Sequence, residues 1–90
     1  MVDACPRPEI EYPCRVPFKV IGKEGVLQPE RVAELILQRL GPQAEEDRIP
    51  TINRKGAYIS YTFWVTLPDA LAERPLREAI HALPGCVMQL

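Results

Sequence analysis

The sequence has few residues that could form disulfide bonds or a structural zinc site. It contains three cysteines, Cys5, Cys14 and Cys86, and one histidine, His81, among 90 residues. The odd number of cysteines and the lack of a Cys-x-x-Cys pair argue against a disulfide framework, and reduced thiols are typical of a cytosolic protein. A structural zinc site needs several nitrogen or sulfur ligands close together. We therefore expect a cytoplasmic protein with no disulfide, no metal and no cofactor.

The chain also lacks a charge excess and a long apolar run. Eleven basic residues oppose twelve acidic ones, for a net charge of −1, so no strong field would attract nucleic acid or an anionic membrane. The longest largely apolar runs, such as residues 61–67, are far shorter than the ~20 residues of a membrane span. The first residues do not resemble a secretory signal. The length and a hydrophobic content of 47% predict one small globular domain.

Hydrophobic periodicity and turn residues divide the chain into six elements after a tail. Residues 1–12 show no periodicity, so we expect them to be flexible. Pro29 suits the first turn of a helix, and Gly41-Pro42 is a strong stop signal. The expected elements are a strand from residue 14 to Gly22, a helix over 29–40, a short strand over 48–53 that contains Pro50, a hairpin turn over 53–56, a long strand over 57–67, a helical stretch between Pro68-Asp69 and Pro84-Gly85, and a last strand over 86–90.

The long strand is the clearest of these elements. Strict alternation predicts that its odd-numbered residues from Ile59 to Leu67 lie on one face and that Tyr58, Ser60, Thr62, Trp64 and Thr66 lie on the other. Matching faces of the other elements complete a hydrophobic core. The residues expected to be mostly buried are Val16, Phe18, Leu35, Ile36, Ile59, Phe63, Val65, Ile80 and Met88.

The order strand, helix, strand, strand, helix, strand predicts an α+β fold. Two interleaved βαβ units give the ferredoxin-like sandwich, in which both helices cover one face of a four-stranded antiparallel sheet. Residues 13–90 would form this single domain. Two prolines fit it poorly. Pro17 falls in a strand inside the sheet, which predicts a bulge there or regular pairing only after it. Pro75 predicts a kink, or a helix that becomes regular from that residue.

Three short motifs resemble the YbeD-like family of small bacterial proteins. The segment Tyr12-Pro13-Cys14, followed by Phe18-Lys19-Val20-Ile21-Gly22, resembles the opening of that family. Lys55-Gly56-x-Tyr58-x-Ser60 resembles its central hairpin, and Val87-Met88-x-Leu90 resembles its C-terminus. The motifs are short, but their order and spacing match over about residues 12–90. The chain departs from the family in its many prolines.

The resemblance implies a ferredoxin-like fold similar to the ACT domains that sense small molecules in amino-acid metabolism. The family is also labelled as lipoic-acid-binding regulatory proteins, which implies a loose link to lipoate or amino-acid metabolism. It supplies no catalytic residues to carry over. The expected function is thus a non-enzymatic regulatory or binding protein of undefined ligand, and the alternative is an ACT-like sensor whose ligand lies at a dimer seam.

Three enzymatic or nucleic-acid hypotheses have weaker support. The loop 22–25 precedes a helix and could bind phosphate, as in acylphosphatase-like hydrolases, but Arg31 and Asn53 are not placed as that chemistry needs. The segment 55–61 resembles an RNA-binding strand, yet its two tyrosines would point to opposite faces. A thiol-protease site would need a cysteine, a histidine and a carboxylate, for which Cys14, His81 and Glu78 are candidates. Nothing in the sequence predicts that the nucleophile and the base are aligned.

The face of the sheet without helices is the candidate interface. Tyr58 and Trp64 share it by parity, and Val87 of the last strand would join them. An apolar patch of this kind marks an interaction surface unless long neighbours such as Lys19 cover it. We expect the protein to act as a homo-oligomer or through a partner protein that binds this open face, with no catalytic residues and no membrane or nucleic-acid partner.

Overall fold

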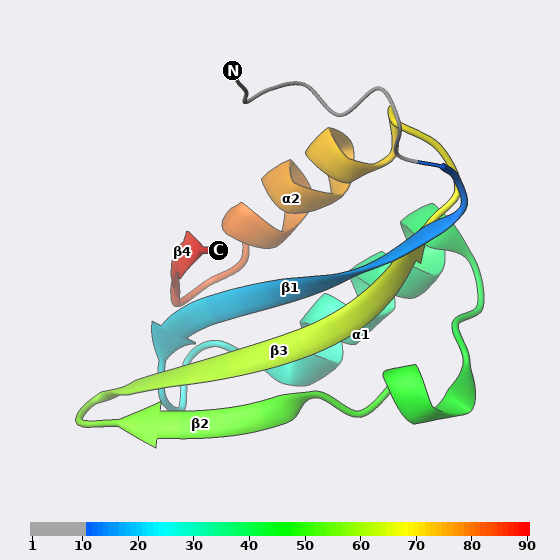
Figure 1. Cartoon of the computed structure of the whole chain (residues 1–90). Coiled ribbons are helices and arrows are strands. Elements are labelled where there is room, and N and C mark those ends of the chain that lie inside the picture. The colour runs from blue at the N-terminus through cyan, green and yellow to red at the C-terminus, as the bar shows by residue number, and fades with distance from the viewer. Residues whose placement is uncertain (1–10) are drawn as a thin grey trace, which may run out of the picture.

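A computed structural model describes residues 11–90, so the expected tail over 1–12 lies almost wholly outside the described residues. Its elements are β1 (Cys14–Lys23), α1 (Pro29–Leu40), the short 3-10 helix η2 (Glu45–Asp47), β2 (Thr51–Lys55), β3 (Tyr58–Leu67), α2 (Glu73–His81) and β4 (Cys86–Gln89). The four strands form one antiparallel sheet in the order β2-β3-β1-β4, and both helices lie on one side of it (Figure 1). The ferredoxin-like α+β fold is confirmed.

The central pair β1–β3 carries the core. Its register runs without a shift from Cys14 opposite Leu67 to Lys23 opposite Tyr58. Alternation along both strands sends one set of side chains toward the helices, where Phe18 and Phe63 lie opposite each other and are fully buried. The predicted inward face of the long strand is therefore confirmed.

Pro17 does not cause the expected bulge. It lies in the continuous β1–β3 register, opposite Trp64. Two residues later, the Lys19 N–H donates to the Leu90 carbonyl on the β4 side. Because backbone groups alternate along a strand, the nitrogen of Pro17 faces the same side, beyond the end of β4, where no N–H is needed. Only the pairing with β4 begins after Pro17, which is the other possibility that the sequence left open.

The β2–β3 hairpin is shifted from its predicted place. β2 begins at Thr51, after Pro50, and continues to Lys55, which pairs with Tyr58. The turn is therefore Gly56-Ala57 rather than residues 53–56. Gly56 has a φ of 64°, and two-residue hairpin turns need positive φ, which glycine adopts without strain. Asn53 becomes a strand residue as a result.

The two helices follow their end signals to different degrees. α1 has the predicted bounds, and Gly41 ends it with a φ of 85°. α2 begins at Glu73, later than the expected start at Pro68-Asp69 and before Pro75. Pro75 is the third helical residue, and residues of the first turn have no intrahelical acceptor for their N–H. The proline is tolerated there, so the helix does not start at Pro75 but two residues before it.

The last strand begins in the predicted phase, with Cys86 against the core, but its phase reverses after Cys86. Gly22 pairs with Cys86 and Ile21 with Met88, so Val87 is an extra residue in a bulge. The bulge turns Met88 to the face without helices, where it is 48% exposed, and the prediction of a buried Met88 is wrong. Gln89 instead faces α2, where its Nε2 donates to the Arg77 carbonyl at 2.7 Å.

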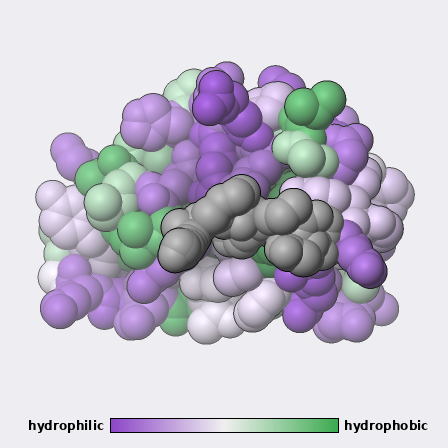
Figure 2. Space-filling model, turned by 45° about the horizontal axis from the view of Figure 1, so that its top comes forward, coloured by the Kyte–Doolittle hydropathy of each residue, from purple (hydrophilic) through white to green (hydrophobic). Residues whose placement is uncertain are grey.

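The rest of the predicted core is largely confirmed. Among the nine expected residues, Val16 and Leu35 are half-buried and pack against the core. The fully or nearly fully buried ones are Phe18, Ile36, Ile59, Phe63, Val65 and Ile80. Figure 2 shows the molecule with the top of Figure 1 tilted forward, where hydrophobic residues form separate groups among hydrophilic ones. No helix within residues 11–90 is long and apolar enough to cross a membrane.

Candidate functional site: the open face of the sheet

The face of the sheet opposite the helices, called the open face here, is built by strand parity. The registers place on it the odd-numbered residues of β1 and β2, the even-numbered residues of β3, and Met88. These positions hold no aspartate or glutamate. They hold four basic residues, namely Arg15, Lys19, Lys23 and Lys55. Although the net charge of the chain is −1, the strands present only positive charge on this face.

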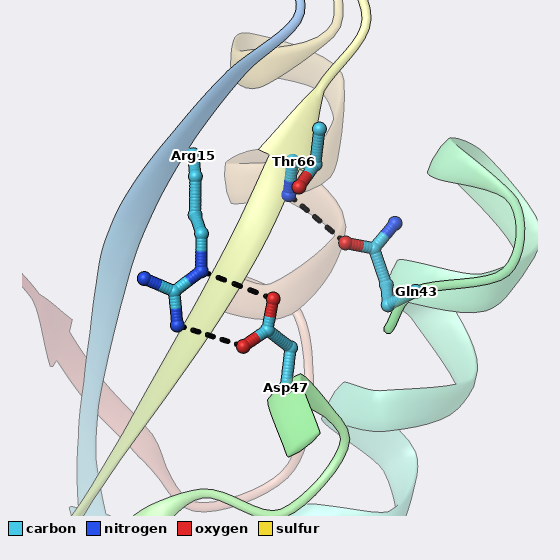
Figure 3. Close-up of polar contacts among 4 residues, drawn as sticks. All are labelled: Arg15, Gln43, Asp47 and Thr66. Atoms are coloured by element: carbon cyan, nitrogen blue, oxygen red, sulfur yellow. Dashed lines mark hydrogen bonds and ion pairs between the residues drawn. The ribbon is translucent and has the colours of Figure 1, made fainter. Parts of the chain in front are cut away.

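The end of the open face near Trp64 is covered by Arg15. The Arg15 guanidinium carbon lies 4.4 Å from the centroid of the Trp64 ring, a cation–π geometry. The guanidinium continues across β3 to Asp47 of η2, with Nε to Oδ2 at 3.1 Å and Nη2 to Oδ1 at 2.8 Å (Figure 3). The hydrogen bond from Arg15 lowers the pKa of the Asp47 carboxyl. Asp47 is buried, and its partner lies 32 residues away in sequence, so no local pattern indicated it.

A second side chain supports the same loop. The Gln43 side-chain oxygen accepts a hydrogen bond from the Thr66 backbone N–H at 2.9 Å (Figure 3). β2 reaches only as far as Thr51, opposite Thr62, so this part of β3 has no neighbouring strand on that side. Gln43 thus supplies the acceptor for the Thr66 N–H that a neighbouring strand would otherwise supply. Both contacts hold residues 41–50 against the sheet, and sequence reasoning found neither.

The four predicted interface residues do not form one patch. Tyr58 and Trp64 are both on the open face and are 48% and 39% exposed. Six residues separate them along β3, which corresponds to roughly 20 Å at the rise of a strand. Lys19 lies between them, opposite Thr62, and is half-buried. Val87 is the bulged residue of β4 and is separated from β3 by β1.

A hollow of about 330 Å³ lies on the half of the open face nearer to the hairpin. Its lining residues are Lys19, Ile21, Asn53, Lys55, Tyr58, Ile59 and Ser60. Asn53 and Ser60 are directly opposite each other, and their short side chains leave space between longer neighbours. Within residues 11–90, Lys19 and Lys55 are not members of any ion pair.

A larger hollow, of about 560 Å³, lies between α1 and the loop that leads to η2. Its walls are mainly apolar and include Ile36, Leu37 and Phe63, whereas Glu30 and Glu34 contribute carboxylates. Leu37 is 55% exposed. This hollow shares no lining residue with the hollow beside Tyr58, and Asp47, the partner of Arg15, is also among its lining residues.

The structure does not assemble the weaker alternatives. In the loop 22–25 the Lys23 N–H donates to the Gly85 carbonyl and the Glu24 N–H donates to the Ala57 carbonyl, so these two amides are not available to an anion. Cys14 begins β1, whereas His81 ends α2, which leads into β4 at the other end of β1. Over residues 11–90, no group of three potential metal ligands is found. Tyr58 and Tyr61 lie on opposite faces, as expected.

Comparisons with known proteins agree with the motifs. Residues 7–90 match the model of the family described as "Protein of unknown function (DUF493)". A UPF0250 protein of Shewanella amazonensis (strain ATCC BAA-1098 / SB2B) is 32% identical over 78 residues, which cover 84% of each chain. No solved structure matches the chain significantly. The chain thus belongs to the DUF493 family, which includes the YbeD-like small bacterial proteins and whose function is not known.

Proposed function

We propose that this chain is a non-enzymatic binding or regulatory domain of the cytoplasm that associates through the open face of its sheet with a second copy of itself or with a partner protein. The observation that carries the proposal is the set of exposed apolar side chains on a face that no helix covers. Tyr58, Trp64 and Met88 are each between 39% and 48% exposed there. Exposed aromatic and methionine side chains are enriched where proteins bind one another.

The exposure of large apolar side chains to water on the open face is unfavourable, and this supports the proposal. The face of a sheet that is exposed only to water is expected to carry polar residues, such as Ser60 and Thr62. Large apolar residues add hydrophobic surface to such a face without contributing to the core. Their burial against another chain would contribute about 25 cal/mol per Å² of apolar surface removed from water. This contribution favours association over a free surface.

A small-molecule sensor of the ACT type is a second candidate. The hollow beside Tyr58 lies on the same open face, so a chain that covered this face would enclose a ligand at the seam. The setting that the resemblance to the YbeD-like family implies for such a sensor is lipoate or amino-acid metabolism. A ligand screen run on associated and dissociated protein separates this candidate from association alone, because only a seam-bound ligand would require both chains.

The proposal is tested by sedimentation of wild type, Trp64→Lys and Leu71→Lys across a concentration series. Leu71 is 84% exposed and lies in the loop before α2, so Leu71→Lys makes the same kind of change away from the open face. We expect wild type and Leu71→Lys to associate and Trp64→Lys to shift toward monomer while melting cooperatively.

If Trp64→Lys unfolds, Met88→Lys at the edge of the same face replaces it, since Met88 is 48% exposed and is not part of the core. Two results would contradict the proposal. One is a wild type that stays monomeric and binds no partner protein. The other is association of the Trp64 and Met88 variants that equals that of wild type.

A further inference from the structure

We propose that the hollow beside Tyr58 on the open face is a binding site for a small organic oxyanion, a carboxylate or phosphate monoester attached to a short planar or apolar body. The hollow is the one that a second chain would cover in the sensor candidate, but the inference goes beyond that candidate, because it assigns the chemical class of the ligand and places its binding on one monomer without association.

The site is preformed by rigid strands. Three neighbouring strands supply its walls: Lys19 and Ile21 from β1, Tyr58 and Ser60 from β3, and Asn53 from β2. Asn53, Ser60 and Ile21 form one row across the sheet, since Ser60 pairs with both of the others. Sites on strands hold their groups in place more precisely than sites on loops. The row therefore gives the hollow a fixed floor.

Charge selects an anion. Lys19 and Lys55 flank the row from opposite directions along the strands, and each is outside every ion pair of the described residues. The strands place no carboxylate on this face. By contrast, Arg15 on the same face is paired with Asp47, and Arg54 on the other face is paired with Glu24 at 2.6 Å. The two lysines of the hollow thus keep their charge available.

The neutral lining defines the rest of the ligand. Tyr58 offers a half-exposed ring and Ile21 an apolar side chain, and both suit a planar or apolar body. The Asn53 side-chain amide can donate to an oxyanion. Lysine acts as a point charge rather than a planar fork, so it accepts a carboxylate and a phosphate alike.

The size of the hollow favours a small ligand over a polymer. A volume of about 330 Å³ is near the lower limit of ligand pockets, which range from about 300 to 1,000 Å³. Single-stranded nucleic acid would need several aromatic side chains on which successive bases stack. On the open face Trp64 already carries Arg15 over its ring, which leaves Tyr58 alone. A small ligand is the occupant that the walls fit.

The experiment is an NMR titration of the full chain with phenyl phosphate, benzoate and the uncharged benzamide. We expect saturable shifts of the Ile21, Asn53 and Ser60 amides with either or both anions, and none with benzamide. The two anions report which oxyanion the site prefers. The double variant Lys19→Gln/Lys55→Gln should bind the preferred anion at least about tenfold more weakly.

The matched control is Lys23→Gln/Arg39→Gln, which removes the same charge. Lys23 is on the open face beside Tyr58 but does not line the hollow, and Arg39 is on α1. Its affinity should stay within about twofold of wild type. The spectra show directly whether each variant is folded.

Three outcomes would overturn the inference: no saturable shift with either anion, equal shifts with benzamide, or equal losses in the control and the site variant. The last would show a diffuse field instead of a site. These results are separate from the sedimentation experiment. A monomeric protein that binds phenyl phosphate would remove the proposed association and leave the anion site intact.

Discussion

Arg15 and Asp47 form a two-point ion pair in which Nε and Nη2 of the guanidinium donate to the two carboxylate oxygens at 3.1 and 2.8 Å. The pair joins β1 to η2 across the width of β3, because Arg15 reaches over Trp64 on the way. Arginine suits this position, since its planar fork matches a carboxylate and its face stacks on an aromatic ring. The position of residues 41–50 therefore depends on a side chain of the first strand.

Removal of this pair should be visible in the fluorescence of Trp64, which is the single tryptophan of the chain. We expect Asp47→Asn to release the Arg15 side chain, expose the ring to water and move the emission to longer wavelength. Glu45→Gln, in the same 3-10 helix but outside the described ion pairs, is the control and should leave the spectrum unchanged. Identical emission from wild type and Asp47→Asn would contradict this role.

The same pair predicts an acid dependence of stability. The hydrogen bond from Arg15 lowers the folded-state pKa of Asp47, so its stabilisation is fully present above the unfolded pKa of about 3.9 and is lost as pH falls through the lower folded value. The difference in unfolding free energy between wild type and Asp47→Asn should be constant near neutral pH and shrink below about pH 4. Chemical denaturation over that range measures it. A difference that grows on acidification has the wrong sign for this mechanism.

The phase of β3 is tested by a pair of truncations. Phe63 is 1% exposed, whereas Tyr58 on the same strand is 48% exposed. Phe63→Ala should lower the free energy of unfolding by about 3–5 kcal/mol, and Tyr58→Ala should lower it by less than about 1 kcal/mol. Urea denaturation gives both values. Similar losses at the two positions would mean that the faces of β3 are assigned wrongly.

Gly85 and Gly25 have similar positive φ values, so their alanine variants distinguish the cost of backbone strain from the cost of crowding by the added Cβ. Gly85 has a φ of 83°, and a Cβ there would lie 2.7 Å from the Leu27 backbone nitrogen; Gly25 has a φ of 87° and nothing within 4 Å. Both alanine variants carry the conformational cost of positive φ. Gly85→Ala should be more destabilising than Gly25→Ala by about 1–3 kcal/mol, because its added Cβ also crowds Val26 and Leu27. Equal melting temperatures of the two variants would contradict this expectation and show that the segment around Val26 and Leu27 can move away from the added Cβ.

The cysteines are expected to be unpaired thiols. Cys14 and Cys86 are free in the structure, and Cys5 lies outside the described residues. Burial raises the pKa of the Cys86 thiol, so less of the reactive thiolate is present near neutral pH. Mass spectrometry after alkylation should show Cys86 reacting more slowly in native than in denatured protein, and Cys5 reacting first. A denatured, unreduced sample with one reactive thiol would show a disulfide.

Local patterns predicted those parts of the fold that local chemistry determines. The alternation along residues 57–67 placed Phe63 and Trp64 on the correct faces, and Gly41 marked the end of α1. The order of elements was enough for the ferredoxin-like topology. Pro17 seemed to oppose it only because the sequence does not show that β4 stops short of that residue.

The hairpin turn and the start of α2 were misplaced locally, by a few residues, whereas three other features depend on contacts that are distant in sequence. The bulge at Val87 arises where β4 pairs with Gly22 and Ile21 of β1, and it exchanges the faces of Met88 and Gln89 in a strand too short to reveal its own pattern. The Arg15–Asp47 pair spans 32 residues. The candidate anion site needs three strands in register, so Asn53 could not be linked to Lys19 until β2 was placed.

The Gln43 side chain at Thr66 also occupies a part of the sheet edge that β2 leaves uncovered. An uncovered stretch of strand edge is a template on which another extended chain can form hydrogen bonds, and this leads to aggregation. Beyond Thr62, β3 has such an edge because β2 is short. The amide oxygen of Gln43 takes the Thr66 N–H at 2.9 Å, so one donor of the edge is already used and the loop lies in the path of an incoming strand. A single side chain therefore protects the part of the β3 edge that β2 does not reach.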